Sequence, residues 1–204
     1  MYPLLETIRF EEGKFNHLAY HLQRMRRSVK DCFDKSLQFD PEEVLYEAQQ
    51  SMTRESGLFK FRLLYSNEDY RWEFIPYKWP HIKTLKMVVD NQIEYGCKFS
   101  DRDRLSQLAA LKGIADDILI VKNNEITDTS FANVIFFDGK KWVTPQHPLL
   151  PGTQRAFLLK NGTILEAIIK PEDVFSFQKA RIINAMIRMD DKAEVNIVYY
   201  YCKF

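Results

Sequence analysis

The chain has 204 residues, of which 46% are hydrophobic and 28% charged, and its formal net charge at pH 7 is +1. These values are typical of a globular protein with one domain or two small ones. A net charge this close to zero gives no long-range attraction for nucleic acid, so we expect no nucleic-acid partner.

The cellular location is predicted from the apolar runs and the cysteines. No apolar run approaches the roughly 20 residues that cross a bilayer, and no basic segment followed by an apolar one marks a signal peptide. The three cysteines, Cys32, Cys97 and Cys202, are odd in number and far apart in the sequence, which fits neither a disulfide framework nor a paired-thiol metal site. We therefore expect a cytoplasmic protein without membrane contact.

The first part of the chain is predicted to combine strands with two helices. Apolar residues recur every three or four positions between Leu18 and Cys32, the spacing of one helix face. Asp40 and Pro41 predict the start of the second helix, because Asp caps exposed N–H groups and Pro fits the first turn. The expected elements are a strand at 4–10, a helix over 18–32, a helix from 41 to about 57, and strands at 58–65 and 70–76.

Lys78-Trp79-Pro80-His81 interrupts this pattern, and we interpret residues 78–81 as a linker between two lobes. The smaller lobe would span residues 1–77 and the larger lobe residues 82–204. Short strands dominate the larger lobe, and Asp138-Gly139 predicts a hairpin turn. The expected elements are strands at 85–89, 117–121, 126–128, 134–137 and 141–143, helices at 104–112 and 153–161, and further short strands around one helical turn near Pro171.

Several common kinds of site are missing from the sequence. None of the four histidines has a cysteine at zinc-ligand spacing, so we expect no metal. No Gly-rich phosphate loop and no Gly-x-Ser-x-Gly nucleophile turn occurs. Four polar stretches remain as candidates: His21–Arg24 on the first helix, Lys98–Arg102 after a strand, the polar interruption Glu125–Val134 between strands, and Leu150–Arg155 at a helix start.

Each stretch alone has a structural explanation, since most charged residues face solvent. Together they contain the groups that pyridoxal phosphate (PLP) requires. Lys98 supplies an amine that can form a Schiff base and then move protons. Asp128 supplies a carboxylate that can keep the pyridine nitrogen protonated. Arg24 and the helix start at Gly152-Thr153 supply a guanidinium and backbone N–H groups for the phosphate.

The order of these motifs resembles the class IV aminotransferases, a family that includes branched-chain and D-amino-acid aminotransferases and aminodeoxychorismate lyase. The matching motifs are Glu6-Thr7-Ile8-Arg9, His21-x-x-Arg24, Lys98-x-x-x-Arg102, Ile126-Thr127-Asp128 with Ala132-Asn133-Val134, and Leu150-Pro151-Gly152. The resemblance implies an α+β fold of two α/β lobes, PLP fold type IV, with the cofactor in the cleft between them. It also implies a homodimer in which the partner's small lobe helps to close each site.

The resemblance also implies a role for each matching residue. Lys98 would be the Schiff-base lysine, and Arg62 is a candidate for a substrate carboxylate, with a structural salt bridge as an equal alternative. Asp128 stands where the family usually has Glu, which is longer by one C–C bond, about 1.5 Å. The expected cofactor-binding residues are Arg24, Lys98, Asp128, Gly152, Thr153, Gln154, Asn184 and Ala185.

Three functions are open at this point. The first hypothesis is a PLP-dependent aminotransferase that moves an amino group between a small amino acid and a 2-oxo acid. The second is a 4-amino-4-deoxychorismate lyase, which would use the same lysine to eliminate pyruvate and form 4-aminobenzoate. The third is a non-catalytic dimeric homologue. Asp128 and the lack, before Glu6, of the leading strand and Gly-rich turn common in the family favour the third hypothesis. The lysine, the arginine and the helix-start motif oppose it.

Overall fold

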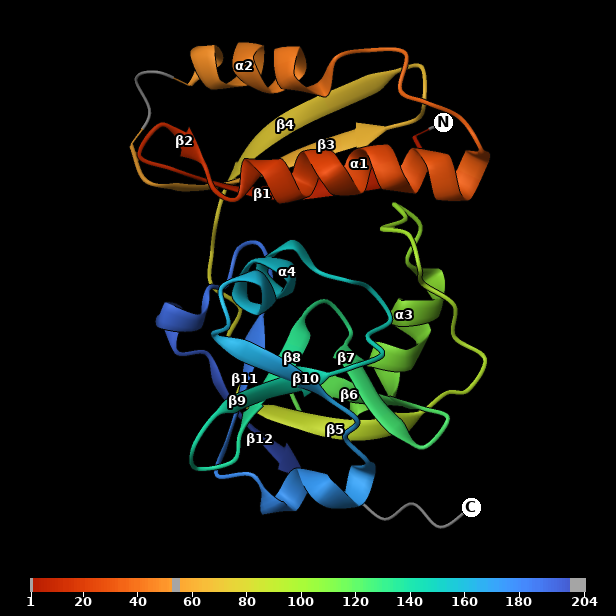
Figure 1. Ribbon diagram of the computed structural model, residues 1–204, viewed down its shortest axis with the longest axis vertical. Coiled ribbons are helices and arrows are strands. Elements are labelled where there is room, and N and C mark those ends of the chain that lie inside the picture. The colour runs from red at the N-terminus through yellow and green to blue at the C-terminus, as the bar shows by residue number, and fades with distance from the viewer. Residues whose placement is uncertain (1, 53–55, 199–204) are drawn as a thin grey trace. The chain divides into compact units, whose positions relative to one another are not determined.

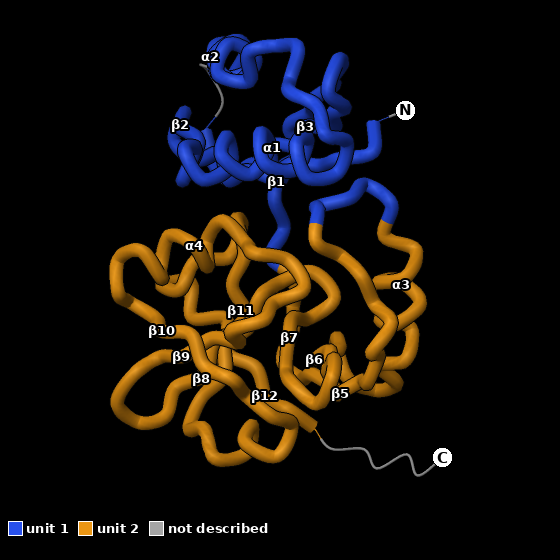
Figure 2. Tube along the Cα trace, turned by 45° about the vertical axis from the view of Figure 1, so that its right-hand side comes forward, with its two compact units in different colours: residues 1–79, 97–101 blue, residues 80–96, 102–204 orange. Residues whose placement is uncertain are grey.

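The computed structural model of the chain describes residues 2–52 and 56–198. The chain divides into two units, shown in different colours in Figure 2. The first unit contains residues 1–79 and 97–101, and the second contains residues 80–96 and 102–204. Among the described residues, no helix has both the length and the apolar character that crossing a membrane requires.

The first unit is a four-stranded antiparallel sheet with two helices packed on it (Figure 1). The strands lie in the order β2-β1-β3-β4, and Leu4 and Ile8 of β1 join a core with residues of both helices. Because side chains alternate along a strand, Glu6 lies on the same face as Leu4 and Ile8. The elements are β1 (Leu4–Glu11), β2 (Lys14–Phe15), α1 (Leu18–Phe33), α2 (Pro41–Ser51), β3 (Leu58–Tyr65) and β4 (Tyr70–Pro76).

The helices and strands predicted for the first unit are confirmed, with one difference in length, and only β2 was not predicted. Asp40 caps α2 by accepting a hydrogen bond from the backbone N–H of Glu42 at 2.9 Å, and Pro41 lies in the first turn. The helix ends at Ser51, whereas the sequence predicted an end near residue 57. Residues 53–55 of that expected extension lie outside the described residues.

The second unit is built on an eight-stranded sheet, part of which closes on itself. The strand order is β10-β9-β8-β11-β12-β5-β6-β7, and β7 also pairs with β8, so the strands from β8 to β7 form a closed barrel. Asp128 and Asn133 are the residues paired at that closure. The strands are β5 (Thr84–Val89), β6 (Asp117–Lys122), β7 (Glu125–Thr129), β8 (Asn133–Phe137), β9 (Trp142–Pro145), β10 (Ile164–Ala167), β11 (Lys179–Ile183) and β12 (Glu194–Val198); the α-helices are α3 (Asp103–Ala109) and α4 (Thr153–Lys160), and the 3-10 turns are η1 (Ala110–Lys112), η2 (Pro171–Ser176) and η3 (Met189–Asp191).

The predicted order of elements in the second unit is also confirmed. The hairpin between β8 and β9 turns at Asp138-Gly139, where Gly139 has a φ of +99°. Asp128 lies inside β7, in agreement with the strand expected at 126–128, and β7 pairs with β6 on one side and with β8 on the other. The sequence did not predict the short turn η3.

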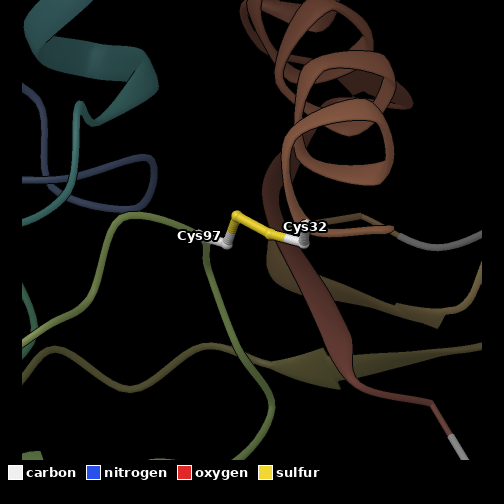
Figure 3. Close-up of a disulfide and its surroundings, with 2 residues drawn as sticks. All are labelled: Cys32 and Cys97. Atoms are coloured by element: carbon white, nitrogen blue, oxygen red, sulfur yellow. A yellow bond between two sulfur atoms is a disulfide. The ribbon is translucent and has the colours of Figure 1, made fainter. Parts of the chain in front are cut away.

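The prediction of unpaired cysteines is wrong for two of the three. Cys32 and Cys97 form a disulfide within the first unit, although 65 residues separate them in the sequence (Figure 3). Their spacing could not reveal the pair, because the two residues meet only after residues 97–101 return to the first unit. The third cysteine, Cys202, lies outside the described residues.

Candidate active site

Lys98 lies on an extended segment that pairs with β1 in the first unit. The backbone N–H of Leu5 donates a hydrogen bond to the carbonyl oxygen of Lys98 at 2.9 Å, and Leu4 forms an antiparallel bridge with Phe99. The neighbouring residue, Cys97, is joined to the C-terminal end of α1 by the disulfide. Main-chain pairing and a covalent crosslink therefore hold the candidate lysine to both β1 and α1.

A fully buried carboxylate, that of Glu6, lies between β1 and α1. Arg24 donates from Nε to Glu6 Oε1 at 2.8 Å and from Nη2 to Oε2 at 2.6 Å, which forms a two-point ion pair. The Nδ1 atom of His21, one helical turn before Arg24, is 2.7 Å from Glu6 Oε2. Burial alone would raise the pKa of Glu6, but Arg24 and His21 outweigh burial and lower the pKa to about 2. Glu6 is therefore ionised at neutral pH.

His21 is neutral in this arrangement. Burial lowers the pKa of its imidazole; Glu6 opposes that effect, and the charges of Arg24 and Lys98 add to it. An ionised carboxylate can only accept hydrogen bonds, so Nδ1 of His21 is the donor to Glu6 and the imidazole tautomer is fixed. The charge of Lys98 thus acts within the same electrostatic environment as Glu6, His21 and Arg24.

In the second unit, Asp128 is held by two donors at the closure of the barrel. Asn133 donates from Nδ2 to Asp128 Oδ1 at 2.8 Å, and the backbone N–H of Leu150 donates to Oδ2 at 2.9 Å. Burial raises the pKa of Asp128 to about 6, because the two hydrogen bonds and the charge of Arg155 offset only part of the lost hydration. Each carboxylate oxygen has a second lone pair, so Asp128 can accept a further hydrogen bond.

Gly152 precedes α4 and lies against Asn133. A Cβ atom at this position would meet the side-chain amide of Asn133, so only glycine fits. The N-cap residue of α4 is Gly152, which has no side chain that could cap the helix, and the first turn contains no acidic residue, which suits an anion at this helix end. Thr153 and Gln154 are both buried, and Gln154 Oε1 has no hydrogen-bond partner among the described residues.

Asn184 forms a tight turn after β11. Its Oδ1 accepts hydrogen bonds from the backbone N–H groups of Met186 at 2.8 Å and Ile187 at 2.9 Å. Its Nδ2 donates a long hydrogen bond of 3.5 Å to the carbonyl oxygen of Phe131, in the turn between β7 and β8. The side chain of Asn184 thus fixes the turn that contains Ala185 and links it to the turn between Asp128 and Asn133.

Arg62 forms a salt bridge, which the sequence analysis gave as the alternative to substrate binding. Arg62 on β3 lies directly opposite Glu73 on β4, and its Nη1 is 2.6 Å from Glu73 Oε1. Both side chains are partly exposed. The contact explains Arg62 without a substrate, and its role toward a substrate carboxylate stays a prediction.

The predicted site residues are divided between the two units. The first unit contains Lys98, Arg24 and Arg62, which come from residues 97–101, from α1 and from β3. The second unit contains Asp128, Gly152, Thr153, Gln154, Asn184 and Ala185.

Three residues of these networks, Glu6, His21 and Asn133, had no role in the sequence predictions, although all three stand in the quoted motifs. Glu6 could have been noticed as the charged residue among the apolar residues of one strand face. The spacing of three residues between His21 and Arg24 places both on one face of a helix, where they can share a partner. No local pattern indicated that Asn133 would pair with Asp128.

No metal cluster accompanies the predicted site residues in the described part of the chain, and one cavity in the second unit is lined by other residues. Within residues 2–52 and 56–198, no three His, Cys, Asp or Glu side chains gather as metal ligands would. A cavity of about 380 Å³ is lined in part by Lys122, Glu125 and His147. We assign it no function, because its charged groups pair with one another: His147 with Glu125 at 2.8 Å and Lys122 with Glu94 at 2.7 Å.

Comparison with known proteins gives matches over most of the chain. The sequence model of the family described as amino-transferase class IV matches residues 3–189. An "Uncharacterized protein" of Haemophilus influenzae is 38% identical over 186 residues, which cover 91% of this chain and 98% of that protein.

Solved structures with the same fold include proteins of similar length. A "putative 4-amino-4-deoxychorismate lyase" from Haemophilus somnus has a TM-score of 0.87 and 36% sequence identity, over 92% of this chain and 98% of that one. A "Putative amino-acid aminotransferase" from Mesorhizobium loti has a TM-score of 0.80 and 24% identity, over 96% of this chain and 99% of that one. Both likenesses confirm the predicted α+β fold of two lobes.

Proposed function

This chain belongs to the class IV aminotransferase family, whose enzymes bind pyridoxal phosphate. Within that family, we propose that it is a PLP-dependent lyase, which converts 4-amino-4-deoxychorismate into 4-aminobenzoate and pyruvate. The observation that carries the choice of reaction is the likeness to the lyase-named structure, which is greater in sequence identity and in TM-score than the likeness to the aminotransferase-named one. Both comparisons extend over nearly the whole of each chain.

Lys98 is the proposed catalytic residue. Its amine would bind the cofactor aldehyde, and main-chain pairing with β1 supports this role because it fixes where the side chain begins. When bound, PLP supplies an electron sink for the electron pair that a substrate carbon gives up with its proton. Nζ of Lys98 would take that proton from the carbon that bears the amino group. The bond to the leaving group then breaks, and the released fragment gains a proton to become pyruvate.

Asp128 is proposed to bind the protonated pyridine nitrogen. Its carboxylate is fixed by Asn133 and Leu150, which supports a directional contact rather than a diffuse charge. A cation beside a buried carboxylate favours the ionised form, so the ring nitrogen and Asp128 would each hold the other in its charged state.

The phosphate is proposed to bind at the start of α4 and at Arg24. The absence of a side-chain cap and of acidic residues in the first turn of α4 supports an anion near Gly152, Thr153 and Gln154. Asn184 and Ala185 would supply a second turn for the same group. These residues fit PLP, since a buried carboxylate for the ring and an uncapped helix end for the phosphate occur in one unit.

The second candidate is an aminotransferase acting on a small amino acid and a 2-oxo acid, which the Mesorhizobium loti structure favours. The two reactions differ in the destination of one proton. In the lyase, the carbon–oxygen bond of the substrate breaks and a proton ends on pyruvate. In the aminotransferase, Lys98 would return the proton to the aldehyde carbon of the cofactor, and water would release the 2-oxo acid.

The purified protein, loaded with PLP, tests the proposal. Borohydride should fix the cofactor to the peptide that contains Lys98, and 4-amino-4-deoxychorismate should give pyruvate and 4-aminobenzoate in equal amounts. Amino transfer to 2-oxoglutarate without pyruvate release would favour the aminotransferase. A protein that stays colourless and unmodified with excess PLP would support the non-catalytic homologue and exclude both enzymes.

We also propose a homodimer, as the family resemblance suggests. Light scattering coupled to size-exclusion chromatography measures the mass directly. A mass near the 24.2 kDa of one chain at micromolar concentration would contradict the dimer.

A further inference from the structure

We infer that Glu6 and His21 are positioning residues for Arg24: they hold its guanidinium in one orientation so that it can bind the phosphate of the cofactor. The inference rests on the proposed function, because that function assigns the phosphate to Arg24. It extends the proposed function by giving a role to two buried side chains that do not themselves contact the cofactor in that scheme.

The geometry of the ion pair fixes the plane of the guanidinium. Two parallel hydrogen bonds, from Nε and Nη2 of Arg24 to the two oxygens of Glu6, leave no freedom to rotate about the end of the side chain. Glu6 is itself immobile, because it projects from the middle of β1, which pairs along its whole length with β3. The orientation of Arg24 is therefore set by the sheet.

His21 fixes the other side of the carboxylate. Its Nδ1–H group donates to Glu6 Oε2, the oxygen that also accepts from Arg24 Nη2. Because His21 and Arg24 both donate to the Glu6 carboxylate from α1, the carboxylate cannot rotate toward one of them without losing its hydrogen bond to the other. His21 therefore reinforces the alignment of Glu6 with Arg24 without adding a charge, since the imidazole is neutral.

A purely stabilising role predicts a different result from a positioning role. The negative charge of Glu6 lowers the attraction of Arg24 for an anion, so removing that charge would strengthen phosphate binding if orientation did not matter. If orientation matters, the same change weakens binding, because the guanidinium is then distributed over several rotamers. The sign of the change in affinity thus separates the two roles.

The strand β1 provides a matched control. Arg9 and Glu11 form a second two-point ion pair, with Arg9 Nε 3.0 Å from Glu11 Oε2 and Nη2 3.1 Å from Oε1. Neither residue has a place in the proposed cofactor site. Glu11→Gln therefore removes the carboxylate charge of a second two-point ion pair on the same strand and leaves the Glu6–Arg24 pair intact.

The test compares PLP with pyridoxal, which lacks the phosphate. Dissociation constants of both compounds are measured by absorbance titration for wild type, Glu6→Gln, His21→Gln and Glu11→Gln, with circular dichroism to establish folding. We expect Glu6→Gln to weaken PLP binding about tenfold, the equivalent of one charge-assisted hydrogen bond. Pyridoxal affinity should stay the same, and Glu11→Gln should bind both compounds as wild type does.

Unchanged or tighter PLP binding by folded Glu6→Gln would overturn the inference, and so would an equal loss of affinity for pyridoxal. If Glu6→Gln does not fold, His21→Gln decides, because it retains the ion pair. A loss of affinity for PLP but not for pyridoxal then supports positioning, and no loss contradicts it. A wild-type protein that binds neither compound would refute the proposed function, an outcome distinct from the failure of Glu6→Gln alone.

Discussion

Gly152 approaches Asn133 so closely that a Cβ atom on the glycine would lie 2.1 Å from Asn133 Oδ1. The same asparagine donates from Nδ2 to Asp128 Oδ1 at 2.8 Å and to the carbonyl oxygen of Leu150 at 3.0 Å. One side-chain amide therefore connects the barrel closure to the segment that leads into α4. The absence of a side chain at position 152 is what allows this connection.

Gly152→Ala should disrupt the connection. The backbone of Gly152 has a φ of −68°, which alanine adopts without strain, so the whole effect comes from contact with Asn133. We expect the free energy of unfolding to fall by about 1–3 kcal/mol, as for other overpacked sites, and PLP affinity to fall with it. Urea unfolding and PLP titration measure the two effects. Gly96→Ala is the control, because a Cβ there meets no atom within 4 Å.

The raised pKa of Asp128 predicts an unusual pH dependence of stability. A carboxyl whose pKa rises on folding, here from 3.8 to about 6, contributes stability that is present below pH 3.8 and is lost as the pH rises from there through 6. Without cofactor, wild type should therefore lose about 2 kcal/mol relative to Asp128→Asn between pH 4 and pH 7. Urea unfolding at a series of pH values measures this difference.

Asp138 provides the control for that experiment. Hydrogen bonds from the backbone N–H groups of Lys141 and Lys140 lower the pKa of Asp138. The stability difference between wild type and Asp138→Asn should therefore change with pH in the opposite direction, with most of the change below pH 3.8, so the series extends to lower pH for this pair. A difference between wild type and Asp128→Asn that stays constant from pH 4 to pH 7 would show that Asp128 titrates normally.

Lys98→Ala should abolish turnover while leaving the fold intact. The segment is held by backbone hydrogen bonds and by the neighbouring disulfide, neither of which uses the lysine side chain. We expect a loss of at least about 10³-fold in kcat, as for other covalent catalytic residues, with no change in the circular dichroism spectrum. Lys140→Ala, on the exposed hairpin, should keep full activity. Activity retained by Lys98→Ala would assign the chemistry to another lysine.

Cys32→Ser should destabilise the first unit under oxidising conditions. The crosslink closes a loop of 65 residues, and loss of a native disulfide costs typically about 2–4 kcal/mol. Urea unfolding with and without a thiol reductant measures the effect, and the reductant should remove the difference between variant and wild type. Cys202→Ser is the matched control for loss of a thiol. Equal stability of wild type with and without reductant would mean that the crosslink contributes nothing.

Elements defined by local patterns could be predicted from the sequence. The apolar spacing from Leu18 to Cys32 predicted α1, and Asp40-Pro41 predicted the start of α2, because both signals involve neighbours along the chain. Asp138-Gly139 predicted a hairpin turn for the same reason. The predicted chemistry of Lys98 and Asp128 followed from residue type and order, which the sequence contains in full.

Contacts between distant residues could not be predicted in this way. Nothing near Cys97 indicates that residues 97–101 pair with β1, because the partner strand lies more than 90 residues earlier. Likewise, the pairing of Asp128 with Asn133 depends on barrel closure, a property of the whole sheet. Glu6, His21 and Arg24 stood in the quoted motifs, but only the packing of α1 on β1 showed that they form one network.

The return of residues 97–101 to the first unit means that the chain passes between the units three times: after residue 79, after residue 96 and after residue 101. A fragment cut at residue 79 would lack Lys98, the extended segment that pairs with Leu4 and Leu5, and the cysteine that meets Cys32. A single recombination crossover therefore cannot transfer the complete first unit from one protein to another. A functional chimera of two relatives would need three matched crossover points, with the short middle piece inherited together with the N-terminal part.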